Sequence, residues 1–132
     1  MEIYSSLQIL ISGLIAGAIL FQSGVVAPTI FTKVSEPSRA PFLRSVFPKL
    51  FKAITLGGVL FITMTLLSST ASVLVYIVGG YTIFAGVLCD ALIPATNKAK
   101  DDGDSKKFAL LHKISVLLTM AVLLVHLSWI FF

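Results

Sequence analysis

Four apolar runs separated by short polar segments set the pattern of this chain. They cover residues 7–31, about 50–67, 71–93 and 108–132. Each is close to the roughly 20 residues that a helix needs to cross the hydrocarbon core of a bilayer. Short connections between consecutive spans favour antiparallel neighbours. The pattern therefore predicts an all-α fold, an integral membrane up-down four-helix bundle in which residues 1–132 form a single transmembrane domain.

Two of the connections are polar, and the third is short and uncharged. Residues 32–49 contain Pro37, Pro41 and Pro48, which predict that this segment is not one unbroken helix. Its second half mixes apolar and basic side chains, as expected for a short helix in the headgroup region that turns into the second span. Residues 94–107 are predicted to form a polar linker, and the serine-rich segment around residue 69 a tight turn.

The basic residues predict the orientation of the bundle. All ten Lys and Arg residues lie in or beside the two polar loops. The positive-inside rule places both loops, 32–49 and 94–107, in the cytoplasm and both termini outside. Tyr4 and Trp129 then lie at the outer interface, where aromatic side chains anchor helices. We expect the protein in the bacterial inner membrane or an equivalent membrane.

Composition excludes several classes of protein. The chain is 57% hydrophobic and 12% charged, whereas soluble domains carry about 25% charged residues. The net charge of +4 is explained by the cytoplasmic loops, so nucleic acid is not an expected partner. The expected partners are the lipid bilayer and either further copies of the chain or other membrane subunits. Cys89 is the only cysteine, which excludes an internal disulfide.

Small residues indicate where helices can approach closely. Gly13 and Gly17 form a Gly-x-x-x-Gly pair, for which packing inside the bundle is the first interpretation. Contact in a homodimer and docking to another subunit are the alternatives. Two Gly-Gly pairs are expected to permit close packing or bending rather than to bind phosphate, because no phosphate-loop lysine follows them. The glycines predicted to serve helix packing are Gly13, Gly17, Gly57, Gly58, Gly79 and Gly80.

Polar groups inside a membrane are costly, which makes them candidates for function. Asp90, near the cytoplasmic end of the third span, and His112, one turn inside the fourth, lie at a similar depth. Asn97, Ser115 and the loop residues Lys49 and Lys52 can join them in a predicted polar cluster at the cytoplasmic end of the bundle. Its first interpretation is a hydrogen bond or ion pair that stabilises the bundle, and the alternative is a site for a substrate, an ion or a proton.

The two histidines raise the possibility of a cofactor. His112 and His126 lie within about 40° of one helix face and ~21 Å apart along the axis, a spacing that resembles the haem-binding helices of cytochrome b. Haem b ligation would need a partner helix, with Met64 or Met120 as a sixth ligand or a parallel homodimer. A copper site with these methionines and Cys89 lacks clustered spacing. A haem-binding or quinone-linked redox protein using His112 and His126 is therefore an alternative function.

Motifs for independent catalysis are missing from the sequence. It has no nucleophile elbow, no His-Glu-x-x-His motif and no second acidic residue inside a span to pair with Asp90. Our main prediction is thus a non-enzymatic membrane subunit, either oligomeric or accessory to another protein. A transporter of small solutes or metal ions is a further alternative, which would require oligomerisation because four helices enclose only a narrow path.

Four short motifs occur in an order that resembles the transmembrane-protein-205-like family, a four-helix membrane domain of unknown function. They are residues 27–31 (APTIF), 44–51 (RSVFPKLF), 93–97 (IPATN) and 108–115 (FALLHKIS). The family pattern continues with an asparagine one turn after the last serine, where this chain has Thr119. The resemblance implies a shared cluster on the cytoplasmic side, formed by Phe47, Pro48, Phe51, Pro94, Asn97, His112 and Ser115.

Overall fold

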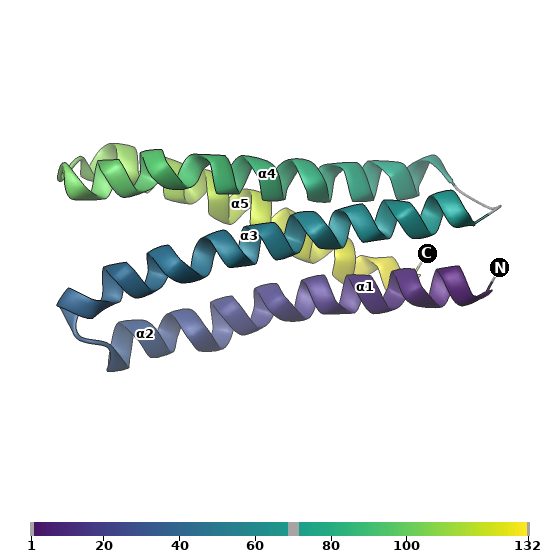
Figure 1. Cartoon of the computed structure of the whole chain (residues 1–132), viewed down its shortest axis with the longest axis horizontal. Helices are drawn as coiled ribbons and strands as arrows, with labels where there is room; N and C mark the ends of the chain where they lie inside the picture. The colour runs from purple at the N-terminus through teal and green to yellow at the C-terminus, as the bar shows by residue number, and fades with distance from the viewer. Residues whose placement is uncertain (1, 69–71, 132) are drawn as a thin grey trace.

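The computed structural model describes residues 2–68 and 72–131, which are helical almost throughout and contain no strand. The first rod consists of α1 (Glu2–Phe21), a π-helical turn η1 (Gln22–Val26) and α2 (Ala27–Lys33) (Figure 1). The other three rods are α3 (Glu36–Leu67), α4 (Val73–Asp101) and α5 (Ser105–Ser128). A short 3-10 turn, η2 (Trp129–Phe131), follows α5.

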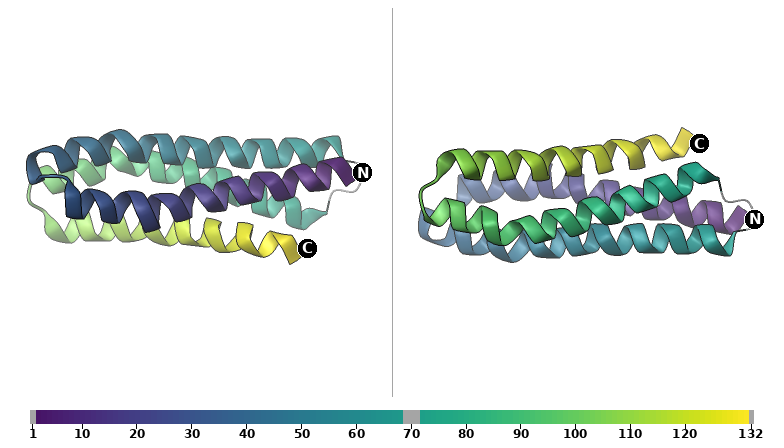
Figure 2. Two further views of the ribbon diagram at one scale, coloured as in Figure 1. Left: turned by 90° about the horizontal axis from the view of Figure 1, so that it is seen from below. Right: turned by 90° about the horizontal axis from the view of Figure 1, so that it is seen from above.

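Consecutive rods run in opposite directions, as Figure 2 shows. The helix α3 packs most extensively against α4, α4 also packs against α5, and α1 contacts both α3 and α5. The bundle is therefore closed, and the predicted up-down four-helix architecture is confirmed. We call the end where α1 begins and α5 ends the termini end, and the end where α3 begins and α4 ends the basic end.

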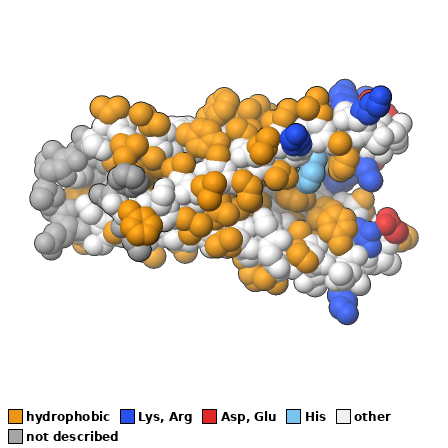
Figure 3. All heavy atoms as spheres, turned by 180° about the vertical axis from the view of Figure 1, so that it is seen from behind, with side chains coloured by type: hydrophobic (Ala, Val, Ile, Leu, Met, Phe, Trp, Pro, Cys, Tyr) orange, Lys and Arg blue, Asp and Glu red, His pale blue; other side chains and the backbone are white. Residues whose placement is uncertain are grey.

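The rods have the dimensions and surface of membrane spans. Four segments are long and apolar enough to cross a bilayer: Ile3–Lys33, Glu36–Leu67, Val73–Asp101 and Ser105–Ser128. On the face shown in Figure 3, apolar side chains cover much of the surface, and Lys and Arg side chains gather toward the basic end. The chain is an integral membrane protein.

The prediction that prolines interrupt residues 32–49 is wrong, because α3 is one helix from Glu36 onward with Pro41 and Pro48 inside it. Pro37 lies in the first turn, where backbone N–H groups lack acceptors within the helix. Pro48 frees the carbonyl group of Arg44, an exposed residue near the basic end, where water can hydrate that group. Extensive packing of α3 against α4 compensates for the lost backbone hydrogen bonds.

The predicted linker 94–107 is also mostly helical. Helix α4 continues past Pro94 to Asp101, and α5 begins at Ser105. The connection is tight because Gly103 adopts a φ of 72°, a conformation that favours glycine. Asp104 caps α5, since its side chain accepts a hydrogen bond of 3.0 Å from the backbone N–H of Lys107. The charged residues thus lie on helical extensions rather than on irregular loops.

The glycines fall into two groups. A Cβ atom at Gly58 would lie 3.0 Å from the backbone nitrogen of Ile83, and one at Gly57 would lie 2.7 Å from the Ile15 side chain. Gly79 and Gly86 also lie in tight helix contacts. The other helical glycines have no atom of the described chain within 4 Å of the Cβ position; they are Gly13, Gly17, Gly24 and Gly80. The interpretation that Gly13 and Gly17 pack inside the bundle is therefore wrong, because both face outward. Gly80, also predicted to serve helix packing, likewise makes no close helix contact within the described chain.

Candidate functional site

A buried histidine joins three helices in the half of the bundle toward the termini end. His126 of α5 is only 3% exposed. Its Nδ1 atom lies 2.9 Å from Ser12 Oγ on α1, and its Nε2 atom lies 2.9 Å from Thr82 Oγ1 on α4. The Thr82 hydroxyl donates its proton to the carbonyl of Val78 (2.8 Å), so its oxygen accepts from Nε2–H. The Ser12 hydroxyl then donates to Nδ1 of a neutral imidazole.

A second polar pair and two aromatic rings surround this histidine. Gln8 Nε2 on α1 donates to Thr65 Oγ1 on α3 (2.8 Å), and both residues are buried. The ring of Phe61 lies edge-on to the rings of His126 and Trp129. Its centroid is 5.5 Å from that of His126 and 5.0 Å from that of Trp129. We call Gln8, Ser12, Thr65, Thr82 and His126 the polar network. It consists of two hydrogen-bonded sets: Gln8–Thr65 links α1 to α3, and Ser12–His126–Thr82 links α1, α5 and α4.

The two histidines lie in different environments. Both ring nitrogens of His126 already have partners, so a metal ligand at either position would displace Thr82 or Ser12. His112 is exposed and stacks on Phe108 of its own helix, with 5.9 Å between ring centroids and 4° between planes. In residues 2–68 and 72–131, no cluster of three or more His, Cys, Asp or Glu residues could hold a metal ion.

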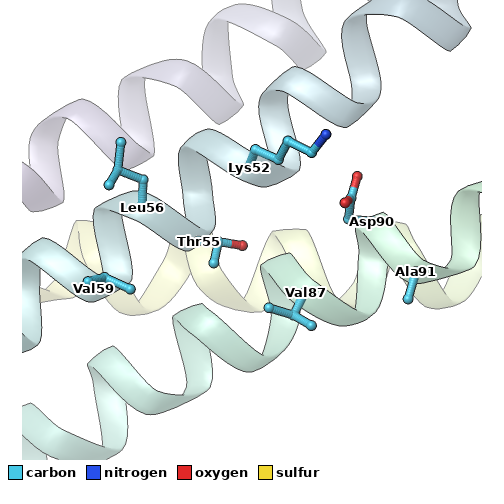
Figure 4. A pocket seen from close by; sticks show the side chains of 7 residues that line it. All are labelled: Lys52, Thr55, Leu56, Val59, Val87, Asp90 and Ala91. Carbon is cyan, nitrogen blue, oxygen red and sulfur yellow. The ribbon is translucent and has the colours of Figure 1, made fainter.

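A groove opens between α3 and α4 in the basic half of the bundle, with a volume of about 490 Å³. Lys52 of α3 and Asp90 of α4 point toward each other from its two sides (Figure 4). Neither side chain forms an ion pair or a hydrogen bond with any residue that the structure describes. We call this feature the Lys52–Asp90 groove. It is lined by Lys52, Thr55, Leu56, Val59, Val87, Asp90 and Ala91.

Three other basic side chains at the basic end form ion pairs. Arg44 of α3 pairs with Asp101 of α4, and Lys98 with Asp102 at 2.9 Å. Arg39 forms an ion pair with the Glu36 carboxylate at 2.6 Å. Its guanidinium also donates to the carbonyl groups of Phe31 (3.0 Å) and Val34 (3.1 Å), which caps the end of α2. In the Lys52–Asp90 groove, by contrast, two opposite charges face each other without forming an ion pair.

A model of the family described as Domain of unknown function (DUF4149) matches residues 10–105. The chain belongs to this family. The DUF4149 match covers most of α1 and all of η1, α2, α3 and α4, including the Lys52–Asp90 groove, and it ends where α5 begins. No curated protein and no solved structure matches the chain.

The polar residues that the sequence predicts to cluster lie on two helices of this DUF4149 chain, and their side chains do not bond to one another. Asp90 faces the groove with α3, whereas His112 lies exposed on α5. Asn97 is half-buried on α4, and Ser115 is half-buried on α5. The carbonyl oxygen of Ser115 accepts hydrogen bonds from Thr119 and Cys89. Between the described side chains of Asp90, Asn97, His112 and Ser115, we find no hydrogen bond or ion pair.

The family-motif residues differ in burial, and Pro94 is exposed. Phe51 is buried in the core, and its ring stacks on Phe47 with 6.0 Å between centroids. Pro48 and Pro94 lie within α3 and α4. Met64 is half-buried on α3.

Sequence reasoning missed four members of the polar network: Gln8, Ser12, Thr65 and Thr82. A usable signal exists in the first span, because Gln8 and Ser12 are four residues apart and so share one helix face. Threonine gives a weaker signal, since its hydroxyl is commonly satisfied by its own helix, as Thr65 is by the Phe61 carbonyl at 3.0 Å.

Proposed function

We propose that this DUF4149 protein is a non-enzymatic membrane subunit that assembles with a second copy of itself through α1. The proposal is supported chiefly by the outward position of Gly13 and Gly17, which have no described atom within 4 Å of the Cβ position. Leu10 and Leu14 are exposed beside them. The face is thus an apolar helix surface with a small-residue depression.

The energetics of glycine support an intermolecular role for this pair. A glycine inside a helix costs about 1 kcal/mol relative to alanine. At Gly57 and Gly58 this cost is offset by close helix contacts within the bundle. At Gly13 and Gly17 no such contact exists in the described chain, so this pair on one face of α1 is open to a contact from another molecule.

The occupant that fits this face best is the same face of a second copy. Copies inserted with the same orientation bring their α1 helices together in parallel, which is the arrangement of Gly-x-x-x-Gly pairs. Close backbone approach requires small residues on both helices, and Gly13 and Gly17 of the second copy supply them. A symmetric dimer about an axis normal to the membrane follows.

The proposal includes an orientation and a finer family relation. The concentration of Lys and Arg toward one end of the bundle supports a cytoplasmic basic end and outer termini, in the bacterial inner membrane or an equivalent membrane. The motif at residues 44–51 supports a relation to the transmembrane-protein-205-like family.

The oligomeric state tests this function directly. Light scattering of the detergent-solubilised protein should give a dimer, and the double variant Gly13→Leu, Gly17→Leu should be monomeric. Gly80→Leu on α4 is the matched control, because its Cβ position is also open, and it should remain dimeric. A monomeric wild-type protein, or a dimer that survives the α1 substitutions, would contradict the proposal.

A further inference from the structure

The packing of α3 against α4 places Lys52 and Asp90 at the same depth. A Cβ atom at Gly86 would meet the backbone nitrogen of Thr55 at 3.0 Å, so residues 55 and 86 lie side by side. The helices are antiparallel, and the same register brings Lys52 opposite the turn that contains Asp90. Figure 4 shows the two side chains directed toward each other.

This depth corresponds to the boundary between hydrocarbon and headgroups. Asp90 follows Val73, the first residue of α4, by seventeen residues, or about 26 Å at 1.5 Å per residue. The hydrocarbon core is about 30 Å thick. If α4 begins at one boundary of the hydrocarbon core, Asp90 therefore lies close to the opposite boundary. The flexible stem of Lys52 can carry its ammonium to the same level.

The polarity of the groove changes along its length. The charged pair lies nearest the basic end, and the walls toward the bilayer centre are formed by Leu56, Val59 and Val87. These three side chains are exposed on the outside of the bundle. A phospholipid has the same order of polarity, with a charged headgroup followed by an apolar chain.

The two charges select the type of headgroup. Lys52 and Asp90 have opposite charge, and neither has a partner among the described residues, which is costly near a low-dielectric medium. A lipid phosphate can accept from Lys52 Nζ while a primary ammonium donates to the Asp90 carboxylate. An anionic headgroup without an ammonium would leave Asp90 facing a phosphate. A quaternary ammonium has no proton to donate.

We infer that the Lys52–Asp90 groove binds one molecule of phosphatidylethanolamine from the surrounding membrane. Its phosphate contacts Lys52, its ammonium contacts Asp90, and one acyl chain lies along the apolar walls of the groove.

Native mass spectrometry of the protein released from vesicles tests this inference. The vesicles contain equal amounts of phosphatidylethanolamine, phosphatidylcholine and phosphatidylglycerol. The wild-type protein should retain phosphatidylethanolamine preferentially. Asp90→Asn and Lys52→Ala should each lower its retention about tenfold, the effect of losing one charge-assisted hydrogen bond. Lys49→Ala is the matched control, because Lys49 is exposed on α3 and does not line the groove.

A variant without any charge change separates lipid binding from folding. Ala91 is exposed at the groove, so Ala91→Trp should fill the groove and displace the lipid while the bundle stays folded. Equal retention of all three lipids, or retention unchanged in both Asp90→Asn and Ala91→Trp, would overturn the inference. A wild-type protein without bound lipid would also overturn it.

Discussion

The two halves of the bundle treat polar side chains in opposite ways. Toward the termini end, the polar network lies inside the bundle, and His126 has hydrogen-bond partners at both ring nitrogens. Toward the basic end, Lys52 and Asp90 lie at the outer surface without partners among the described residues. The comparison teaches that polarity in a membrane helix does not by itself identify a binding site. Satisfied groups hold helices together, and unsatisfied groups that face outward are available to a ligand.

Removing the central histidine should have the largest effect on stability. His126→Ala leaves a cavity and deprives Ser12 and Thr82 of a partner. We expect the free energy of unfolding to fall by about 2–4 kcal/mol. His112→Ala removes an exposed ring and should change this free energy by less than about 0.5 kcal/mol. Unfolding of both variants in detergent measures the difference, and equal losses would show that His126 has no special role in the bundle.

The sequence predicts the architecture well because hydropathy and the cost of charge in a membrane act over whole helices. It predicts helix ends poorly at the basic end, where packing of α3 against α4 maintains a helix across Pro41 and Pro48. Local propensity alone would break it. The structure therefore adds a few turns of helix at the basic end and leaves the number of spans unchanged.

A second variant should open the contact between α3 and α4. A Cβ atom at Gly86 would lie 3.0 Å from the carbonyl oxygen of Phe51 and would also meet Thr55, so Gly86→Ala must move the helices apart. We expect a loss of about 1–3 kcal/mol in the free energy of unfolding. The control is Gly80→Ala, where the space is open and the added helix propensity should leave stability unchanged or slightly higher. A stable Gly86→Ala variant would contradict the close approach of the two helices.

The smallest effect is expected for a paired charge at the basic end. The Arg44–Asp101 ion pair joins α3 to α4, but both side chains are substantially exposed, at 37% and 58%. Arg44→Ala should therefore lower the free energy of unfolding by no more than about 1 kcal/mol, and less at high salt. Chemical unfolding at two salt concentrations measures this. A loss as large as that of His126→Ala would remove the distinction between the two halves.

The candidate sites show where sequence reasoning reaches its limit. The sequence indicates Asp90 because an acid inside a span is rare, and it places both Lys49 and Lys52 near that residue. It does not reveal that Lys52 alone of the two lines the groove. The sequence favours His112 for the polar cluster, because spacing along a helix does not reveal that His126 is the ring that faces the bundle. The sequence also does not reveal which way Gly13 and Gly17 face, since a Gly-x-x-x-Gly pair is identical whether it faces inward or outward.

Thermal unfolding with added phosphatidylethanolamine tests the division between the two halves most directly. The lipid should raise the melting temperature of the wild-type protein, because a ligand that binds only the folded state stabilises it. Asp90→Asn should retain the basal melting temperature and lose the lipid-induced rise, whereas His126→Ala should lower the basal value and retain the rise. The reverse pattern, with Asp90→Asn destabilised but still responsive to the lipid, would contradict the account.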